Sequence, residues 1–211
     1  MSCQVITIAR SLGSGGEEIA RSVARALGFR YLDEEIVRRA AEKAGVSSET
    51  VAQAEHTPGL VIRILDTMGR MPVVPLVGPV VPAAYDPPLG LSAYENLIVE
   101  VIRETAAQGK VVIVAHGAGI HLAGLSGLLR VFITASPTVR AERLVREAKL
   151  DERSARKAVA DSDRQRREYL RRFCDVGQEL ATHYDLVINT DTLPSSQAAE
   201  LVVSAAKAWM A

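Results

Sequence analysis

Cysteine is scarce in this sequence: the 211 residues contain two, Cys3 and Cys174. Because they lie far apart in the chain, they predict neither a disulfide framework nor a zinc site built from thiolates. Aromatic residues make up 4% of the chain, so the sequence offers no series of rings on which nucleic-acid bases could stack. The 25 Lys and Arg are balanced by 25 Asp and Glu. Global charge therefore gives no reason to expect nucleic acid or an anionic membrane as partner.

Long hydrophobic runs are also missing. No apolar stretch reaches the length of a membrane span, and the opening residues MSCQVITIARS contain no basic region ahead of a long apolar core. We therefore expect a cytoplasmic protein without a membrane partner. Because 48% of the residues are hydrophobic, residues 1–211 are expected to form a single domain with a substantial core.

Short apolar runs alternate with helical patterns along the chain. The run QVITIA (4–9) predicts a buried strand, and GEEIARSVARALG (16–28) places Ile19, Val23 and Leu27 on one face of a helix that ends at Gly28. Further strands are predicted at KVVIVA (110–115), RVFITA (130–135) and YDLVIN (184–189). This alternation predicts a three-layer α/β fold, with a mostly parallel sheet that carries helices on both faces.

A proline-rich segment interrupts that pattern. Residues 70–91 contain six of the nine prolines, so neither a regular helix nor a central strand is expected there. We interpret residues 46–92 as an insert lobe. Its proline-rich part either packs over the domain or forms a surface for a homodimer or another partner.

A glycine-rich turn follows the first predicted strand. Gly13, Ser14, Gly15 and Gly16 lie between strand and helix, where backbone N–H groups and the positive helix end can hold a phosphate. The pattern G-x-x-x-x-G-K-[ST] is nevertheless incomplete, because Arg10, Gly16 and Glu17 replace its first glycine, its lysine and its hydroxyl. Glu17 and Glu18 would repel a polyphosphate. A plain glycine turn before a helix with an acidic first turn is the alternative.

Arginines are concentrated in the second half of the chain, and we interpret residues 140–175 as a lid. Arg140 and Arg143 are three residues apart on one side of a predicted helix, and Arg166 follows farther on. Guanidinium groups match phosphate geometry and could stabilise a transferring phosphoryl group. Because acidic residues are interleaved with these arginines, a solvated, salt-bridged helix is the alternative.

The segment VITIARSLGSGGEEIARSVARALGFRYLDEEIVRRAAEKAG (5–45) resembles the start of the cytidylate kinase-like family, a branch of the nucleoside monophosphate kinases with the P-loop fold. The family's arginine, glycines and aspartate are matched by Arg10, by Gly13, Gly15 and Gly16, and by Asp33. The segments 130–173 and 184–202 are similar to the family's strand, arginine helix, lid and final strand, including D-x-x-R-x-x-Y at Asp163, Arg166 and Tyr169.

The resemblance implies phosphoryl transfer from ATP, with Mg²⁺, to a nucleoside monophosphate such as CMP or dCMP. In this interpretation residues 13–16 hold the donor phosphate, Arg10 replaces the charge of the missing lysine, and Asp33 contacts the acceptor. Arg140, Arg143 and Arg166 would stabilise the transition state. For Asp33 the alternative is a helix N-cap. For the whole chain the alternative is a degenerate member that binds nucleotide or a protein partner without turnover.

The chain also departs from the family pattern. Glu17 stands where the family usually has arginine, and Ala115, His116 and Gly119 stand in the family's G-R-x-A-D segment, so its strand-end acid is missing. His116 and His121 have no acidic residue or cysteine nearby in sequence. We therefore predict no metal site held by side chains and interpret both histidines as ordinary polar residues.

Overall fold

The computed structural model describes residues 2–33, 35, 36, 39, 43, 91–114 and 117–209. Apart from residues 91 and 92, the insert expected over 46–92 lies outside the described residues, and so does His116. The chain divides into two compact units, one formed by Met1–Asp33 with Ile102–Ala211 and the other by Glu34–Val101. The fold and the site below belong to the first unit.

In the described part of the chain, five strands form one sheet in the order β2-β3-β1-β4-β5. They are β1 (Val5–Arg10), β2 (Arg30–Leu32), β3 (Val111–Val114), β4 (Leu128–Thr134) and β5 (Leu186–Asn189). Every pairing is parallel, and Val5 of the central strand lies opposite Val111 on one side and Leu128 on the other. The predicted mostly parallel sheet is therefore confirmed.

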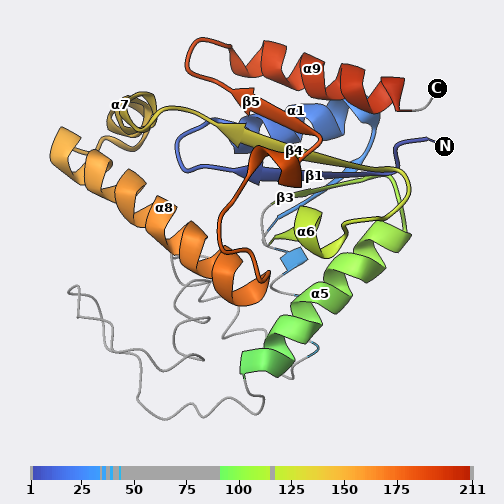
Figure 1. Cartoon of the computed structure of the whole chain (residues 1–211). Helices are drawn as coiled ribbons and strands as arrows, with labels where there is room; N and C mark the ends of the chain where they lie inside the picture. The colour runs from blue at the N-terminus through green and yellow to red at the C-terminus, as the bar shows by residue number, and fades with distance from the viewer. Residues whose placement is uncertain are drawn as a thin grey trace. The chain divides into compact units, whose positions relative to one another are not determined.

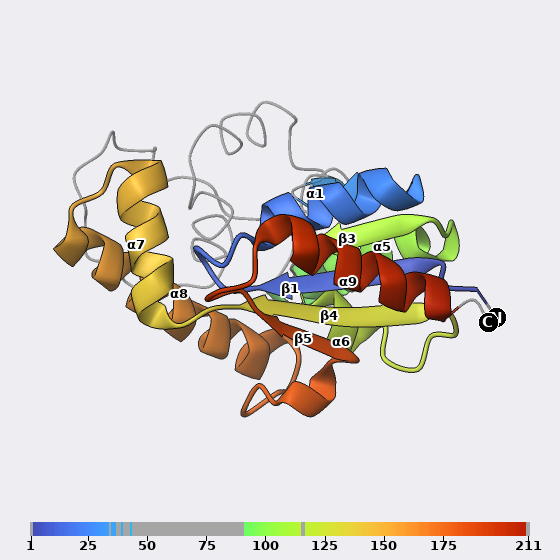
Figure 2. The same cartoon turned by 90° about the horizontal axis from the view of Figure 1, so that it is seen from above.

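Helices cover both faces of this sheet (Figures 1 and 2). α1 (Gly16–Leu27) and α9 (Ser195–Ala208) lie together on one face, while α6 (Ala118–His121) and α8 (Glu152–Phe173) lie on the other. α7 (Pro137–Ala148) stands beyond the carboxyl ends of β1 and β4. The remaining elements are α5 (Leu91–Ala107) and a single 3₁₀ turn at Ala181–His183. None of the helices described is long and apolar enough to cross a membrane.

The main core lies between the sheet and the α1–α9 layer. Ile6 and Ile8 of β1 pack there with Ile19 of α1 and Val202 of α9, and all four side chains are fully buried. The apolar face of α1 therefore packs against the sheet, as the sequence pattern predicts. α1 ends at Gly28 because its φ of 66° is a left-handed conformation that glycine adopts readily, and its N–H caps two helix carbonyls.

The α7–α8 pair is held together by a small core of its own. Ala141, Ala155 and Val159 are buried between the two helices. Each helix begins with a side-chain cap: Ser136 accepts a hydrogen bond from the N–H of Val139, and Asp151 accepts one from the N–H of Ser154. The segment expected to be a lid is thus a helical hairpin, with room on its outer surfaces for charged side chains.

Candidate phosphate-binding site

The glycine-rich loop joins the carboxyl end of the central strand β1 to the N-terminus of α1 (Figure 1). α1, the helix after β1, and α6, the helix after β3, lie on opposite faces of the sheet, which in α/β proteins marks the ligand-binding crevice. Gly13 and Gly15 both have φ of 77°. A Cβ at Gly13 would lie 2.8 Å from the carbonyl oxygen of Arg140, and one at Gly16 would lie 2.6 Å from Cβ of Arg10. Backbone conformation and close packing therefore both select glycine in this loop.

The polar groups of the loop are suited to an anion. Within the described part of the chain, the N–H groups of Gly13, Gly15 and Gly16 have no acceptor, whereas the N–H of Ser14 donates to the carbonyl of Ser11 at 3.1 Å. Ser14 is 1% exposed, and its Oγ is buried without a hydrogen-bond partner among those residues. Because the N-terminus of α1 adds its positive end, the loop can hold a phosphate through N–H donors alone.

Arg10, the residue expected to replace the missing lysine, is bound to carboxylates. Its Nη2 and Nε lie 2.6 and 3.1 Å from Oε1 of Glu17, and Nη2 lies 3.4 Å from Oδ2 of Asp33. The hydroxyl of Tyr31 donates to the same Asp33 oxygen at 3.2 Å. Burial, together with the charge of Asp33, raises the pKa of Tyr31 to about 12. The positive charge of Arg10 is therefore balanced before any ligand is bound.

Arg140 is held inside the protein, where its side chain is 4% exposed. It forms a two-pronged ion pair with Asp163 of α8, with N–O distances of 2.9 and 2.7 Å. Its Nε donates to the carbonyl of Ala135 at 2.9 Å, and its Nη1 approaches the carbonyl of Leu12 in the loop at 3.4 Å. All three of its guanidinium nitrogens contact protein oxygens, and one of these oxygens is the loop carbonyl of Leu12, so Arg140 supports the loop.

Arg143 makes a different set of contacts one helical turn later. Its Nη1 donates to the carbonyl of Gly13 at 3.3 Å and to the hydroxyl of Thr190 at 3.0 Å, and its Nη2 donates to the carbonyl of Thr190. All of these acceptors are uncharged. Among the four arginines expected at the site, Arg143 alone forms no ion pair within the described residues.

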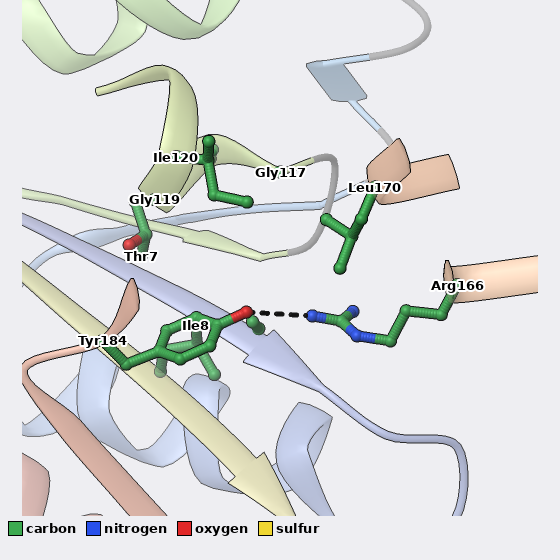
Figure 3. A pocket seen from close by; sticks show the side chains of 10 residues that line it. Thr7, Ile8, Gly117, Gly119, Ile120, Arg166, Leu170 and Tyr184 are labelled. Atoms are coloured by element: carbon green, nitrogen blue, oxygen red, sulfur yellow. Dashed lines mark hydrogen bonds between the residues drawn. The ribbon is translucent and has the colours of Figure 1, made fainter. Parts of the chain in front are cut away.

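Arg166 extends from α8 toward the hydroxyl of Tyr184 (Figure 3). Its guanidinium forms a two-pronged pair with Glu179 at 2.8 and 2.6 Å, lies 3.2 Å from the hydroxyl of Tyr184, and sits over the ring of Phe132. Burial by itself would raise the pKa of Glu179, but the hydrogen bonds and charge of Arg166 outweigh it and hold that pKa below its ordinary value. Arg166 and Tyr184 line a cavity of about 20 Å³, which has room for about one water molecule and none for a nucleotide.

Gly119 stands at the place of the strand-end acid in the family pattern given above. A Cβ at this position would lie 2.8 Å from Oγ1 of Thr7, so a larger residue would require Thr7 to move.

His121, which we interpret as an ordinary polar residue, lies 3.6 Å through its Nε2 from Sγ of Cys174. Burial lowers the pKa of His121 and raises that of Cys174 to about 11. In the described segments, no group of three or more His, Cys, Asp and Glu could hold a metal ion.

Two of the four expected arginines contact carbonyl oxygens of the loop, Arg140 at Leu12 and Arg143 at Gly13. Nη1 of Arg166 lies 3.5 Å from the carbonyl oxygen of Arg10, at the end of β1. Sequence reasoning missed the residues that bind these arginines. Asp163 was visible in the D-x-x-R-x-x-Y pattern, and Glu179 among the later acids, but neither pattern says which arginine each would bind. Thr190 was visible only as the residue that follows a predicted strand.

Replacing Glu179 by Gln should lower the melting temperature at pH 7 by roughly 5 °C, since a part-buried Arg166 loses its partner. The depressed pKa of Glu179 means that its stabilising contribution is complete above pH 4.5 and is lost as the pH falls through the folded-state pKa. The difference in melting temperature between wild type and variant should therefore shrink below pH 4.5 in a series of thermal unfolding measurements.

Glu168→Gln, at an exposed position of α8, is the control, and its melting temperature should differ little from that of the wild type at any pH. An undiminished Glu179 difference at pH 3.5 would contradict this prediction.

In the described residues, an all-parallel sheet with a glycine-rich loop between its central strand and first helix is the arrangement of the P-loop kinase-like class. The chain belongs to the cytidylate kinase-like family, whose model matches residues 5–192. The resemblance seen in the sequence is thereby confirmed, and family membership supports a nucleotide kinase-like function in general terms. No curated protein matches the sequence.

Solved structures with the same fold share little sequence with this chain. An uncharacterised protein from Eubacterium ventriosum is 16% identical with a TM-score of 0.67, covering 96% of this chain and 98% of that one. Shikimate kinase from Bacteroides thetaiotaomicron is 16% identical with a TM-score of 0.53, and the coverages are 96% and 95%. A gluconokinase from Sinorhizobium meliloti is 14% identical with a TM-score of 0.51, with coverages of 99% and 91%. These similarities show the P-loop kinase-like fold.

Proposed function

We propose that this protein binds a nucleotide at the glycine-rich loop and transfers a phosphoryl group from ATP to a nucleoside monophosphate of the CMP or dCMP kind. The observation that carries the proposal is the loop itself: within the described part of the chain, the N–H groups of Gly13, Gly15 and Gly16 have no acceptor and the buried Ser14 Oγ has no partner. These groups lie at the N-terminus of α1, where an anion is favoured.

In this proposal, residues 13–16 bind the donor phosphates of ATP, which supplies the phosphoryl group. Asp33 contacts the acceptor nucleotide at the end of β2. Arg10 reaches both regions, since it lies beside Glu17 at the loop and beside Asp33. It becomes available to a phosphate when its contact with Glu17 is exchanged for one with the ligand. Arg143, which forms no ion pair in the described residues, stabilises charge at the loop.

The described residues contain no group of side chains that could hold Mg²⁺ by themselves. They contain no group of three or more His, Cys, Asp and Glu that could hold a metal ion, and Glu17 and Asp33, two carboxylates near the loop, are bound by Arg10. Protein sites for Mg²⁺ generally combine one or two carboxylates with substrate phosphates. We therefore assign no step of the reaction to a metal held by this chain.

A second candidate function is nucleotide binding without turnover. The observation that favours it is charge balance: Arg10, Arg140 and Arg166 each pair with a carboxylate. Phosphoryl transfer depends on positive groups that stabilise charge on the transferring phosphoryl oxygens. If the three pairs persist when nucleotide is bound, the loop retains the ligand but little charge remains to lower the barrier.

The two functions are separated by thermal unfolding with a panel of ATP, GTP, CMP, dCMP, UMP and AMP with Mg²⁺, while ADP release is followed in parallel. A ligand at about 100 times its dissociation constant adds roughly 2.7 kcal/mol of stability, which we expect to raise the melting temperature by several degrees. Kinase function predicts this shift together with ADP formation that depends on CMP or dCMP. A shift without turnover supports the binding function, and no shift with any nucleotide would remove both.

The loop's part in that shift is tested by Gly13→Ala. The added Cβ would lie 2.8 Å from the carbonyl oxygen of Arg140, and alanine at this position would have to adopt φ of 77°. The nucleotide-dependent shift of the melting temperature should therefore be lost. The matched control is Gly28→Ala, where φ is 66° but no atom lies within 4 Å of the added Cβ. This control should lower the melting temperature by a few degrees through backbone strain, and it should retain the shift.

A further inference from the structure

Thr190 follows β5 directly and is 2% exposed. Its N–H donates to the carbonyl of Thr134 at 2.8 Å, which continues the β4–β5 pairing by one residue. Its hydroxyl donates to the carbonyl of Ser14 at 2.8 Å, accepts from Nη1 of Arg143 at 3.0 Å and lies 3.2 Å from the carbonyl of Thr134. A residue at the end of the edge strand is therefore joined to the phosphate loop by its side chain alone.

Thr190 completes a series of contacts along the loop. Three successive loop carbonyls each have a donor from outside the loop: Leu12 from Arg140 at 3.4 Å, Gly13 from Arg143 at 3.3 Å, and Ser14 from Thr190 at 2.8 Å. The contact made by Thr190 is the shortest of the three. It also supports the second, because the same hydroxyl accepts a hydrogen bond from Arg143.

These contacts set the direction of the loop's N–H groups. In a planar trans peptide, the carbonyl of one residue and the N–H of the next point to opposite sides. A donor on the carbonyl of Leu12 therefore turns the N–H of Gly13 away from Arg140. A donor on the carbonyl of Ser14 likewise turns the N–H of Gly15 away from Thr190. Both N–H groups have no acceptor in the described part of the chain.

We infer that Thr190 is a positioning residue of the phosphate loop: by holding the Ser14 carbonyl and orienting Arg143, it keeps the loop's N–H groups directed at the ligand's phosphate. The inference rests on the proposed nucleotide binding at residues 13–16. In this proposal Thr190 acts through the backbone of the loop, which binds phosphate groups that ATP and GTP share. Its loss should therefore weaken binding of ATP and GTP by the same factor, without altering the preference between them.

The experiment compares Thr190→Val, Thr190→Ser and wild type by calorimetric titration with ATP and GTP. Val keeps the shape of Thr but removes the hydroxyl's contacts with Ser14, Arg143 and Thr134, and we expect about tenfold weaker binding of both nucleotides. Ser restores the hydroxyl and should bind within about threefold of wild type. Thr105→Val is the matched control, because Thr105 is 1% exposed and its hydroxyl has no partner among the described residues. It should leave both affinities unchanged.

The possible outcomes separate this inference from the function on which it rests. Wild-type protein that binds neither nucleotide removes the proposed function, and the inference falls with it. Wild type that binds while Thr190→Val binds equally well overturns only the role of Thr190, and a changed ratio between ATP and GTP does so too. If Thr190→Val does not fold, Thr190→Ser is compared with Thr190→Cys instead. These two side chains differ only in carrying an oxygen or a sulfur atom, and sulfur is the weaker hydrogen-bond donor. Equal affinity of that pair would overturn the inference, and weaker binding by the Cys variant would support it.

Discussion

Replacing Glu17 by Gln is expected to strengthen ATP binding roughly tenfold. In the wild type, Glu17 neutralises Arg10 at 2.6 Å and adds a negative charge in the first turn of α1. Gln keeps the size and hydrogen-bonding ability of Glu but carries no charge, so Arg10 gains freedom to contact a phosphate. At about 4 Å, a single charge interaction is worth about 1 kcal/mol in water and about 4 kcal/mol near a protein surface. Because the Glu17 side chain is 56% exposed, we expect a value at the lower end, about 1.4 kcal/mol, which is tenfold.

Glu18→Gln provides the matched control for this prediction. Glu18 is the next residue, is exposed, and lies in the same first turn of α1, but no ion pair with Arg10 is found for it in the described structure. The control removes the same charge from the same helix end and should change ATP affinity by less than about threefold. AMP, which has fewer phosphate charges, should gain less than ATP from Glu17→Gln. Equal gains from the two glutamates would show that general charge, and not the Arg10 contact, limits binding.

The fold was predictable because its signals are local in the sequence. The buried strand at Val5–Arg10, the glycine turn and the apolar face of Gly16–Leu27 each appear within one short segment. A parallel sheet follows from their alternation with helices, and the structure confirms it. The glycines at 13, 15 and 16 were recognised for the same reason, since the special backbone conformation of such a turn restricts the residues that fit there. Their role in binding phosphate stays a prediction.

The partners of the arginines were not predictable from the same kind of signal. The sequence left two interpretations of Arg140 and Arg166 open, phosphate contact and salt bridges with interleaved acids. In the structure they pair with Asp163 and Glu179, 23 and 13 residues away. Which acid meets which arginine depends on how α7 packs against α8 and how the chain returns after α8. The contact between Thr190 and Ser14 spans 176 residues, and only the assembled sheet brings these two together.

The second large effect is expected from Arg140→Ala, which should lower the stability of the protein. The change should lower the free energy of unfolding by about 3 kcal/mol, because it leaves Asp163 without its partner and the carbonyl of Ala135 without its donor in a buried setting. For a chain of this size, that corresponds to a melting temperature lower by roughly 10 °C. Urea unfolding followed by circular dichroism measures the free energy. Arg164→Ala is the matched control: Arg164 pairs with Asp161 on the exposed side of α8, and such pairs contribute less than about 1 kcal/mol.

The double variant Arg140→Met with Asp163→Leu separates the ion pair from the volume of the side chain. Because both charges are removed together, no buried charge remains unpaired, and the double variant should be more stable than Arg140→Ala. If Arg140 is instead a phosphate ligand, Arg140→Ala should lose turnover while its stability stays unchanged. Stability equal to that of wild type in Arg140→Ala would therefore contradict the structural role. Because Arg140 is bound to Asp163 and Arg166 to Glu179, the proposed function assigns the charge that contacts a nucleotide, among the four arginines expected at the site, to Arg143 and to Arg10 once it leaves Glu17.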